Sequence, residues 1–189
     1  SQLVTIDGKT MRGTIPKGET QGVHLLAAYL PAEGVVLKQV EVGRKANEIS
    51  AAPQLVSRLH LKNRVVCGDA MQTQRQLSVH ILAQGGDYLW FLKENQPALL
   101  ADVQRFFEPP QQAAGWSLPI YPHTVATTTN KGHGRLEKRT LTRMVDDEQF
   151  LDWPGVRQVF RLERLAKSIH EGKETTEIVY GLTSCDPNI

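Results

Sequence analysis

The 189-residue sequence has only two cysteines, 6% aromatic residues and no long hydrophobic run. Cys67 and Cys185 do not form a Cys-x-x-Cys pair, so we expect no disulfide framework and a reducing compartment. The longest apolar stretch, Leu25 to Leu30, is far shorter than the roughly 18 residues that a membrane-spanning helix needs. The N-terminus also lacks a signal-peptide layout. These absences predict a cytoplasmic protein without a membrane segment.

An excess of one charge is also missing. The formal net charge of +2 comes from 22 basic and 20 acidic residues, and so small an excess says little about nucleic acid. The distribution is less even, because Lys131 to Arg143 contains five basic residues and the single acid Glu137. Such a basic stripe fits a solvated hairpin face as well as a DNA contact.

The 40% hydrophobic content excludes a disordered chain, and apolar periodicity predicts strands alternating with helices first and mostly strands later. We expect three helices. The first has Ser50 as its N-cap and Pro53 in its first turn, and the second begins with a capping box of Thr73 and Gln76. The third opens at Asn95 and Pro97. Strands are predicted over 3–7, 23–30, 35–42, 64–68, 88–92, 125–129, 136–145, 159–165 and 175–182.

This order predicts an α/β fold, with a mixed sheet flanked by helices over residues 1–108 and a strand-rich region over 109–189. The loop-like segment Pro109 to Gly115 divides the two regions. Because strands are predicted close to both ends, we expect a fragment of a longer protein.

Two aspartates stand where chemistry is expected in such a sheet. Asp7 and Asp69 each follow a short apolar strand, and ligands bind beyond the carboxyl ends of strands. If the two strands are parallel neighbours, the carboxylates can share divalent metal ions for phosphodiester chemistry. Each also has a plain structural explanation, because Asp7-Gly8 is common in turns and Asp69 can end a strand or cap a helix.

Other catalytic patterns are absent from the sequence. It has no Gly-x-Ser-x-Gly elbow, no phosphate-binding glycine loop and no His-x-x-x-His or His-Glu-x-x-His spacing. His133 and Glu137 are four residues apart, but the segment looks extended, so we do not expect a zinc site there.

Five ordered blocks resemble the DDE insertion-sequence transposases, in particular the branch that includes the H-repeat-associated proteins. The resemblance spans nearly the whole chain. The blocks are Ile-Asp-Gly-Lys-Thr-Met-Arg-Gly at 6–13, Gly-Asp-Ala-Met-Gln-Thr-Gln at 68–74, Gly-Asp-Tyr through Lys-Glu-Asn-Gln over 86–96, His-Gly-Arg-Leu-Glu at 133–137 and Tyr-Gly-Leu-Thr-Ser at 180–184.

The resemblance implies an RNase H-like catalytic core over 1–108, followed by a strand-rich C-terminal insertion. It implies that Asp7 and Asp69 are the first two catalytic, metal-binding acids. Mg²⁺ or Mn²⁺ would act in pairs in DNA cleavage and strand transfer, with two ions bound only when the third acid and DNA are present. The implied partner is double-stranded DNA at transposon ends, and the protein can form a homo-oligomer.

The third acid is where the sequence departs from the family pattern. In the family it lies on a helix with a Trp-x-x-Glu motif after the Tyr-x-x-Thr-Ser block, and residues 185–189 contain no such motif. Glu137 is the nearest candidate, but its place between Arg135 and Lys138 favours a structural ion pair. We therefore expect that the chain alone neither cleaves nor joins DNA.

Several basic residues are candidates for contacts to DNA phosphates, although ordinary solvent exposure explains them as well. Near the carboxyl edge of the sheet these are Lys9, Arg12 and Lys93, and in the basic stripe they are Arg135, Lys138 and Arg139.

Two other functions remain open at this point. One is an inactive transposon remnant that acts at most as a DNA-binding module. The other is a small-molecule phosphohydrolase that uses a strand-end aspartate as nucleophile or metal ligand. A phosphohydrolase needs a closed pocket, whereas a transposase needs an open groove wide enough for duplex DNA.

Overall fold

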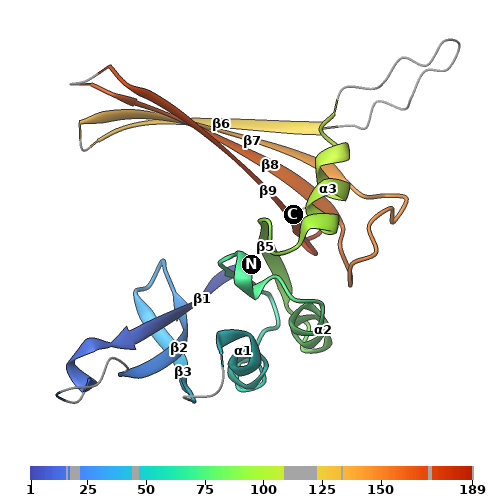
Figure 1. The fold of residues 1–189 in the computed structure, drawn as a ribbon. Coiled ribbons are helices and arrows are strands. Elements are labelled where there is room, and N and C mark those ends of the chain that lie inside the picture. Colours follow the sequence, from blue (N-terminus) through green and yellow to red (C-terminus); the bar gives the residue numbers. More distant parts are fainter. Residues whose placement is uncertain are drawn as a thin grey trace, which may run out of the picture. The chain divides into compact units, whose positions relative to one another are not determined.

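The computed structural model describes residues 1–15, 17, 22–43, 47–108, 123–132, 134–169 and 172–188. These residues divide into two compact units, whose elements are labelled in Figure 1. The first unit comprises Ser1–Trp90 and Trp153–Gly155, and the second comprises Phe91–Asp152 and Val156–Ile189.

The first unit contains a mixed sheet with the strand order β3-β2-β1-β4-β5. β1 pairs antiparallel with β2 and parallel with β4, β2 pairs antiparallel with β3, and β4 pairs parallel with β5. The strands are β1 (Gln2–Met11), β2 (Val23–Leu30), β3 (Val35–Val42), β4 (Arg64–Gly68) and β5 (Asp87–Leu92, of which the first four residues belong to this unit). The helices are α1 (Glu48–Val56) and α2 (Arg75–Ala83), with short 3-10 helices η1 (Arg12–Thr14) and η2 (Ala70–Gln72).

Alternating burial along β1 shows how the sequence forms this sheet. Val4 and Ile6 are buried, whereas Leu3 and Asp7 are exposed, as expected for a strand with one face against a core. Leu26 of β2 is also fully buried. Each such side chain contributes about 1.5–3 kcal/mol through burial.

The segment Trp153–Gly155 belongs to the first unit although it is distant in sequence. Trp153 Nε1 donates a hydrogen bond to Ser78 Oγ at 3.2 Å, and the buried Trp90 donates to the same oxygen at 2.9 Å. Tyr88 donates through its hydroxyl to the carbonyl of Pro154 at 2.7 Å. The sequence pattern did not predict this return of the chain.

Two predicted helix starts are wrong. Asn47 rather than Ser50 is the N-cap of α1, because Asn47 Oδ1 accepts from the backbone N–H of Ser50 at 2.9 Å and Ser50 Oγ closes the capping box. The helix therefore starts earlier, and Pro53 lies inside it rather than in its first turn. Likewise α2 starts at Arg75, and its N-cap is Gln74 rather than the predicted Thr73.

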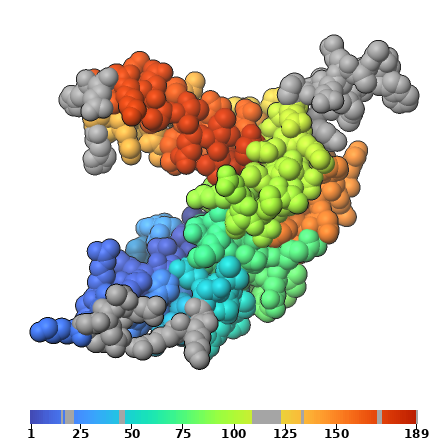
Figure 2. Space-filling model, viewed as in Figure 1, coloured from blue at the N-terminus to red at the C-terminus, as the bar shows by residue number. Residues whose placement is uncertain are grey.

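The second unit contains the antiparallel strand order β9-β8-β7-β6. α3 packs against β9, and the Phe107 ring lies 5.8 Å from that of Tyr180. All of β6 and the first half of β9 are exposed, and the red residues of β9 lie open at the surface in Figure 2. The elements are α3 (Pro97–Arg105), β6 (His123–Gly132), β7 (Arg135–Val145), β8 (Gln158–Ser168) and β9 (Glu174–Thr183).

The predicted α/β class is confirmed, and the mixed sheet with its helices is consistent with an RNase H-like fold. The division expected after residue 108 stays a prediction, and the loop Pro109 to Gly115 lies outside the described residues. Among the helices in the described part of the chain, none is long and apolar enough to cross a membrane.

Candidate active site

Asp7 and Asp69 are brought side by side by the pairing of β1 with β4. The parallel ladder runs from Gln2 opposite Arg64 to Ile6 opposite Gly68, and the two aspartates are the next residue on each chain. Neighbouring strands lie about 4.8 Å apart. The prediction that these strands are adjacent and parallel is confirmed.

The register of the ladder before the two aspartates favours a shared face of the sheet. Thr5 and Cys67 lie opposite each other in the ladder, and Thr5 Oγ1 is 3.4 Å from Cys67 Sγ. Asp7 is two residues further along β1, and Asp69 directly follows β4 with an extended backbone, so continued alternation would give the two side chains the same face. Burial raises the pKa of the Cys67 thiol, and the hydrogen bond with Thr5 opposes this shift.

Both carboxylates are exposed, and their oxygens fit a divalent cation by donor chemistry. Asp69 Oδ1 accepts from the Met71 backbone N–H at 3.0 Å and so caps η2, as the structural explanation of this residue predicted. The Asp7 carboxylate makes no hydrogen bond or ion pair with any described residue. Asp7 does not lie at a strand end as predicted, nor in a turn, because β1 continues to Met11 and pairs with β2 along this stretch. Over the described ranges, no three His, Cys, Asp or Glu side chains form a metal-binding group.

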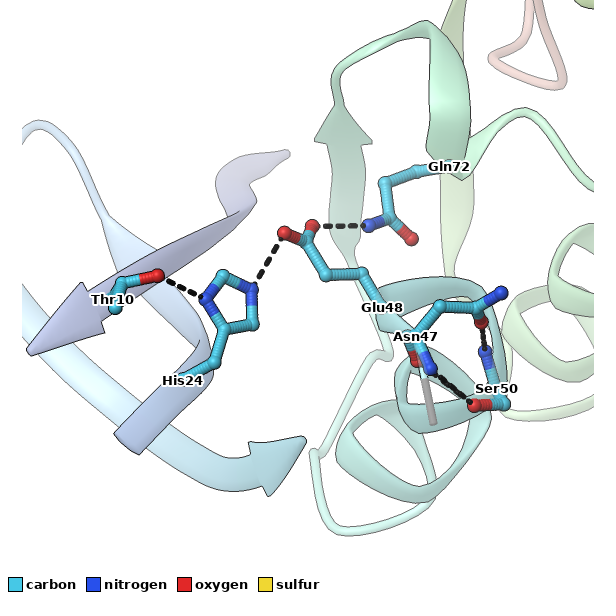
Figure 3. A network of polar contacts seen from close by, with 6 residues as sticks. All are labelled: Thr10, His24, Asn47, Glu48, Ser50 and Gln72. Atoms are coloured by element: carbon cyan, nitrogen blue, oxygen red, sulfur yellow. Dashed lines mark hydrogen bonds and ion pairs between the residues drawn. The ribbon is translucent and has the colours of Figure 1, made fainter. Parts of the chain in front are cut away.

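A third carboxylate, Glu48 of α1, lies against the strand that carries Asp7. Its Oε1 is 2.9 Å from His24 Nε2, and its Oε2 accepts from Gln72 Nε2 at 3.2 Å (Figure 3). A Cβ atom on Gly8 would overlap this carboxylate, so the glycine leaves room for the observed conformation of Glu48. Sequence reasoning missed Glu48 because an acid in the first turn of a helix is ordinarily explained by the helix dipole.

The basic residues predicted near the carboxyl edge are exposed. Lys9 is two residues after Asp7 on β1 and so has the same face, while Arg12 lies in η1. Lys93 directly follows β5 and belongs to the second unit. None of the three side chains makes an ion pair with a described residue.

The basic stripe of the second unit is divided between the two faces of the sheet. Arg135 and Arg139 share a face with Glu137, whereas the intervening Lys138 has the opposite face. The predicted stripe is therefore not one surface. His133, which precedes it, lies outside the described residues.

Glu137 is held by arginines, as the ion-pair interpretation predicted. The Nε atoms of Arg139, Arg164 and Arg135 lie 2.6, 3.1 and 3.9 Å from its carboxylate oxygens. Its side chain is only 11% exposed. Arg164 was missed because it reaches Glu137 from β8, where it pairs with Arg139 across the strands.

The sequence matches one family model and several curated proteins. The family model described as "Transposase DDE domain" matches residues 1–150. In Escherichia coli K12, "H repeat-associated putative transposase YhhI" is 30% identical over 191 residues, covering 97% of this chain and 49% of that protein. "H repeat-associated putative transposase YbfD" is 33% identical over 138 residues, covering 72% and 52%.

A further relative, "Putative transposase YncI" of Escherichia coli O157:H7, is 32% identical over 197 residues, covering 98% of this chain and 47% of that protein. The chain thus spans about half the length of these curated relatives. Since the family model covers far more than half of the chain, the protein belongs to the transposase DDE domain family.

Proposed function

We propose that this chain carries two of the three metal-binding acids of a DDE transposase that cleaves DNA and transfers strands. The observation that carries the proposal is the register of β1 and β4, which makes Asp7 and Asp69 the next residues after a parallel pair. Family membership supports the transposase class, and the neighbouring exposed carboxylates support the metal chemistry.

Asp7 and Asp69 are the residues that hold Mg²⁺ or Mn²⁺ in this proposal. Ions held there would activate a water or a DNA 3′-hydroxyl as nucleophile and would stabilise the negative charge of in-line phosphodiester displacement. Two carboxylates leave a hard cation largely hydrated, so binding without DNA is weak. Lys9 and Arg12 contribute positive charge near the phosphates that complete the metal shell.

The third acid of this proposal is not Glu137. Three arginines compensate its buried charge, and a metal ion would have to displace them. Because the curated relatives are about twice as long as the matched region, we place the third acid in sequence beyond residues 1–189.

Double-stranded DNA at transposon ends is the proposed substrate, bound by a homo-oligomer. In the second unit, Arg135 and Arg139 form the proposed phosphate-contacting face, and Lys138 provides a separate contact from the opposite face. Lys93 is a further candidate phosphate contact.

Calorimetry with Mn²⁺ tests the metal site directly. The 189-residue chain should bind Mn²⁺ weakly, and Asp7→Asn or Asp69→Asn should weaken binding at least tenfold. Asp147→Asn removes the same charge from an exposed site in the second unit and serves as the matched control. Equal binding by the parent and the Asp69→Asn variant contradicts the assignment.

A further inference from the structure

A hydrogen-bonded network joins α1 to the strands that lead to the two aspartates. Thr10 Oγ1 on β1 lies 2.9 Å from His24 Nδ1 on β2, and the other ring nitrogen of His24 contacts Glu48. Figure 3 shows Glu48 between His24 and Gln72, with one carboxylate oxygen directed at each. The Glu48 side chain is 17% exposed, so these contacts are partly shielded from water.

Two glycines allow this network to lie directly on the backbone. The Glu48 carboxylate occupies the place where a Cβ of Gly8 would be, one residue after Asp7. Gln72 packs on Gly68, one residue before Asp69, where a Cβ would come within 2.9 Å of Gln72 Cγ. The Glu48–Gln72 hydrogen bond therefore links the backbone beside one aspartate to the backbone beside the other.

The network lies behind the two aspartates rather than between them. Gly8 and Gly68 are each one residue from an aspartate, and consecutive strand residues have opposite faces. Over the described residues, Glu48 accordingly does not join Asp7 and Asp69 in a three-ligand group. This placement favours a support for the backbone that carries the two aspartates over a metal ligand.

The orientation of Gln72 adds a second observation. This residue is 1% exposed, and its Oε1 is buried without a hydrogen-bond partner while its Nε2 donates to Glu48. An unsatisfied buried oxygen costs about 1–3 kcal/mol. The side-chain amide of Gln72 is thus oriented so that its NH₂ group donates to Glu48, while its carbonyl oxygen is left without a hydrogen bond.

We propose that Glu48 is a positioning residue that fixes the separation of the backbone at Gly8 of β1 from that at Gly68 of β4, so that Asp7 and Asp69 can share a divalent cation. This inference rests on the proposed function. Because the contacts of Glu48 are hydrogen bonds, the side-chain shape matters more than the negative charge. Glutamine can accept from Gln72 and place its NH₂ against His24, whereas alanine removes the partner of both His24 Nε2 and Gln72 Nε2.

The test measures the Mn²⁺ affinity of the 189-residue chain from the electron paramagnetic resonance signal of free Mn²⁺. Each variant is measured at a temperature at which a urea titration shows that it is fully folded. Glu48→Ala should weaken Mn²⁺ binding about tenfold or more, and Glu48→Gln should stay within about threefold of the parent. Glu41→Ala, an exposed acid on β3, is the matched control and should bind like the parent. If Glu48→Ala does not fold, Gln72→Met provides the same test, because it keeps the packing on Gly68 and removes the donor to Glu48.

The possible outcomes separate this inference from the proposed function. Equal losses in Glu48→Gln and Glu48→Ala would make Glu48 a charged ligand and overturn the positioning role. The positioning role is also overturned if Glu48→Ala, or Gln72→Met where it replaces that variant, loses stability but keeps its Mn²⁺ affinity. In that case, weakened Mn²⁺ binding by Asp69→Asn still supports the assignment of Asp69 to the metal site. If the parent itself binds no Mn²⁺, both the site and its support are wrong.

Discussion

The Nε atom of Arg139 lies 2.6 Å from Oε1 of Glu137, a carboxylate that is only 11% exposed. The single acid of the basic stripe is therefore an ion-pair partner of the arginines around it. Glu137 compensates the arginines around it, and they in turn compensate its burial.

Replacement of Glu137 by Gln should lower the free energy of unfolding. The change leaves three arginines close together without their shared anion, and because their side chains are 42–59% exposed, the expected loss is only about 1–2 kcal/mol. Urea unfolding measures the loss, with the exposed Glu148→Gln as control. A midpoint equal to that of the parent would show that the cluster is not stabilising.

Neutralising Arg135 and Arg139 together should weaken binding to duplex DNA and flatten its salt dependence. Each lost phosphate contact lowers the slope of log affinity against log salt by about 0.9. Lys138→Gln, on the opposite face, should change the slope less than the double Gln variant does. Fluorescence anisotropy between about 50 and 200 mM salt measures both slopes. An unchanged slope in the double variant would show that Arg135 and Arg139 do not contact phosphates and only form a solvent-exposed face.

Metal-dependent nicking of transposon-end DNA should be absent from the 189-residue chain and present in a longer version that continues beyond residue 189. In-line displacement needs both the attacking and the leaving oxygen clamped, and two carboxylates leave that geometry incomplete. A gel assay with Mn²⁺ compares the two proteins. Nicking by the short chain that Glu137→Gln abolishes would make Glu137 the third acid.

Ser78→Ala should destabilise the first unit strongly for so small a change. The Ser78 hydroxyl accepts from both Trp90 and Trp153, and its removal leaves two indole N–H groups unsatisfied in the core. The expected loss is about 2–6 kcal/mol, at about 1–3 kcal/mol for each such group. Thermal unfolding followed by tryptophan fluorescence measures it. A loss below about 0.5 kcal/mol would show that the shared hydrogen bonds contribute little.

Alkylation of Cys67 should require a higher pH than alkylation of a free cysteine. Burial raises the pKa of this thiol, so less reactive thiolate is present at neutral pH. Thr5→Val removes the hydrogen bond that lowers the pKa and should shift the midpoint of the rate against pH further upward. The rates are measured with iodoacetamide in a Cys185→Ser background. A downward shift in Thr5→Val would contradict the sign of this contact.

Much of the fold follows from local sequence patterns. The predicted bounds of β2, β3 and β4 agree with the structure, since alternating or continuous apolar residues flanked by turn residues are a local property. The helix starts were less predictable. Asn47 and Ser50 are both favourable caps, and only the observed hydrogen bonds distinguish them.

The sequence by itself identified Asp7 and Asp69 as candidates, because each directly follows a short apolar run, but it left the parallel pairing of their strands as a condition that the structure meets. Only the tertiary structure decided which other residues join them. Glu48 reaches Gly8 and Arg164 reaches Glu137 through contacts between residues far apart in the chain. Such contacts depend on strand register, and a shift of one residue would exchange the two faces of a strand. Local periodicity therefore predicts the strands, whereas their packing determines which side chains meet.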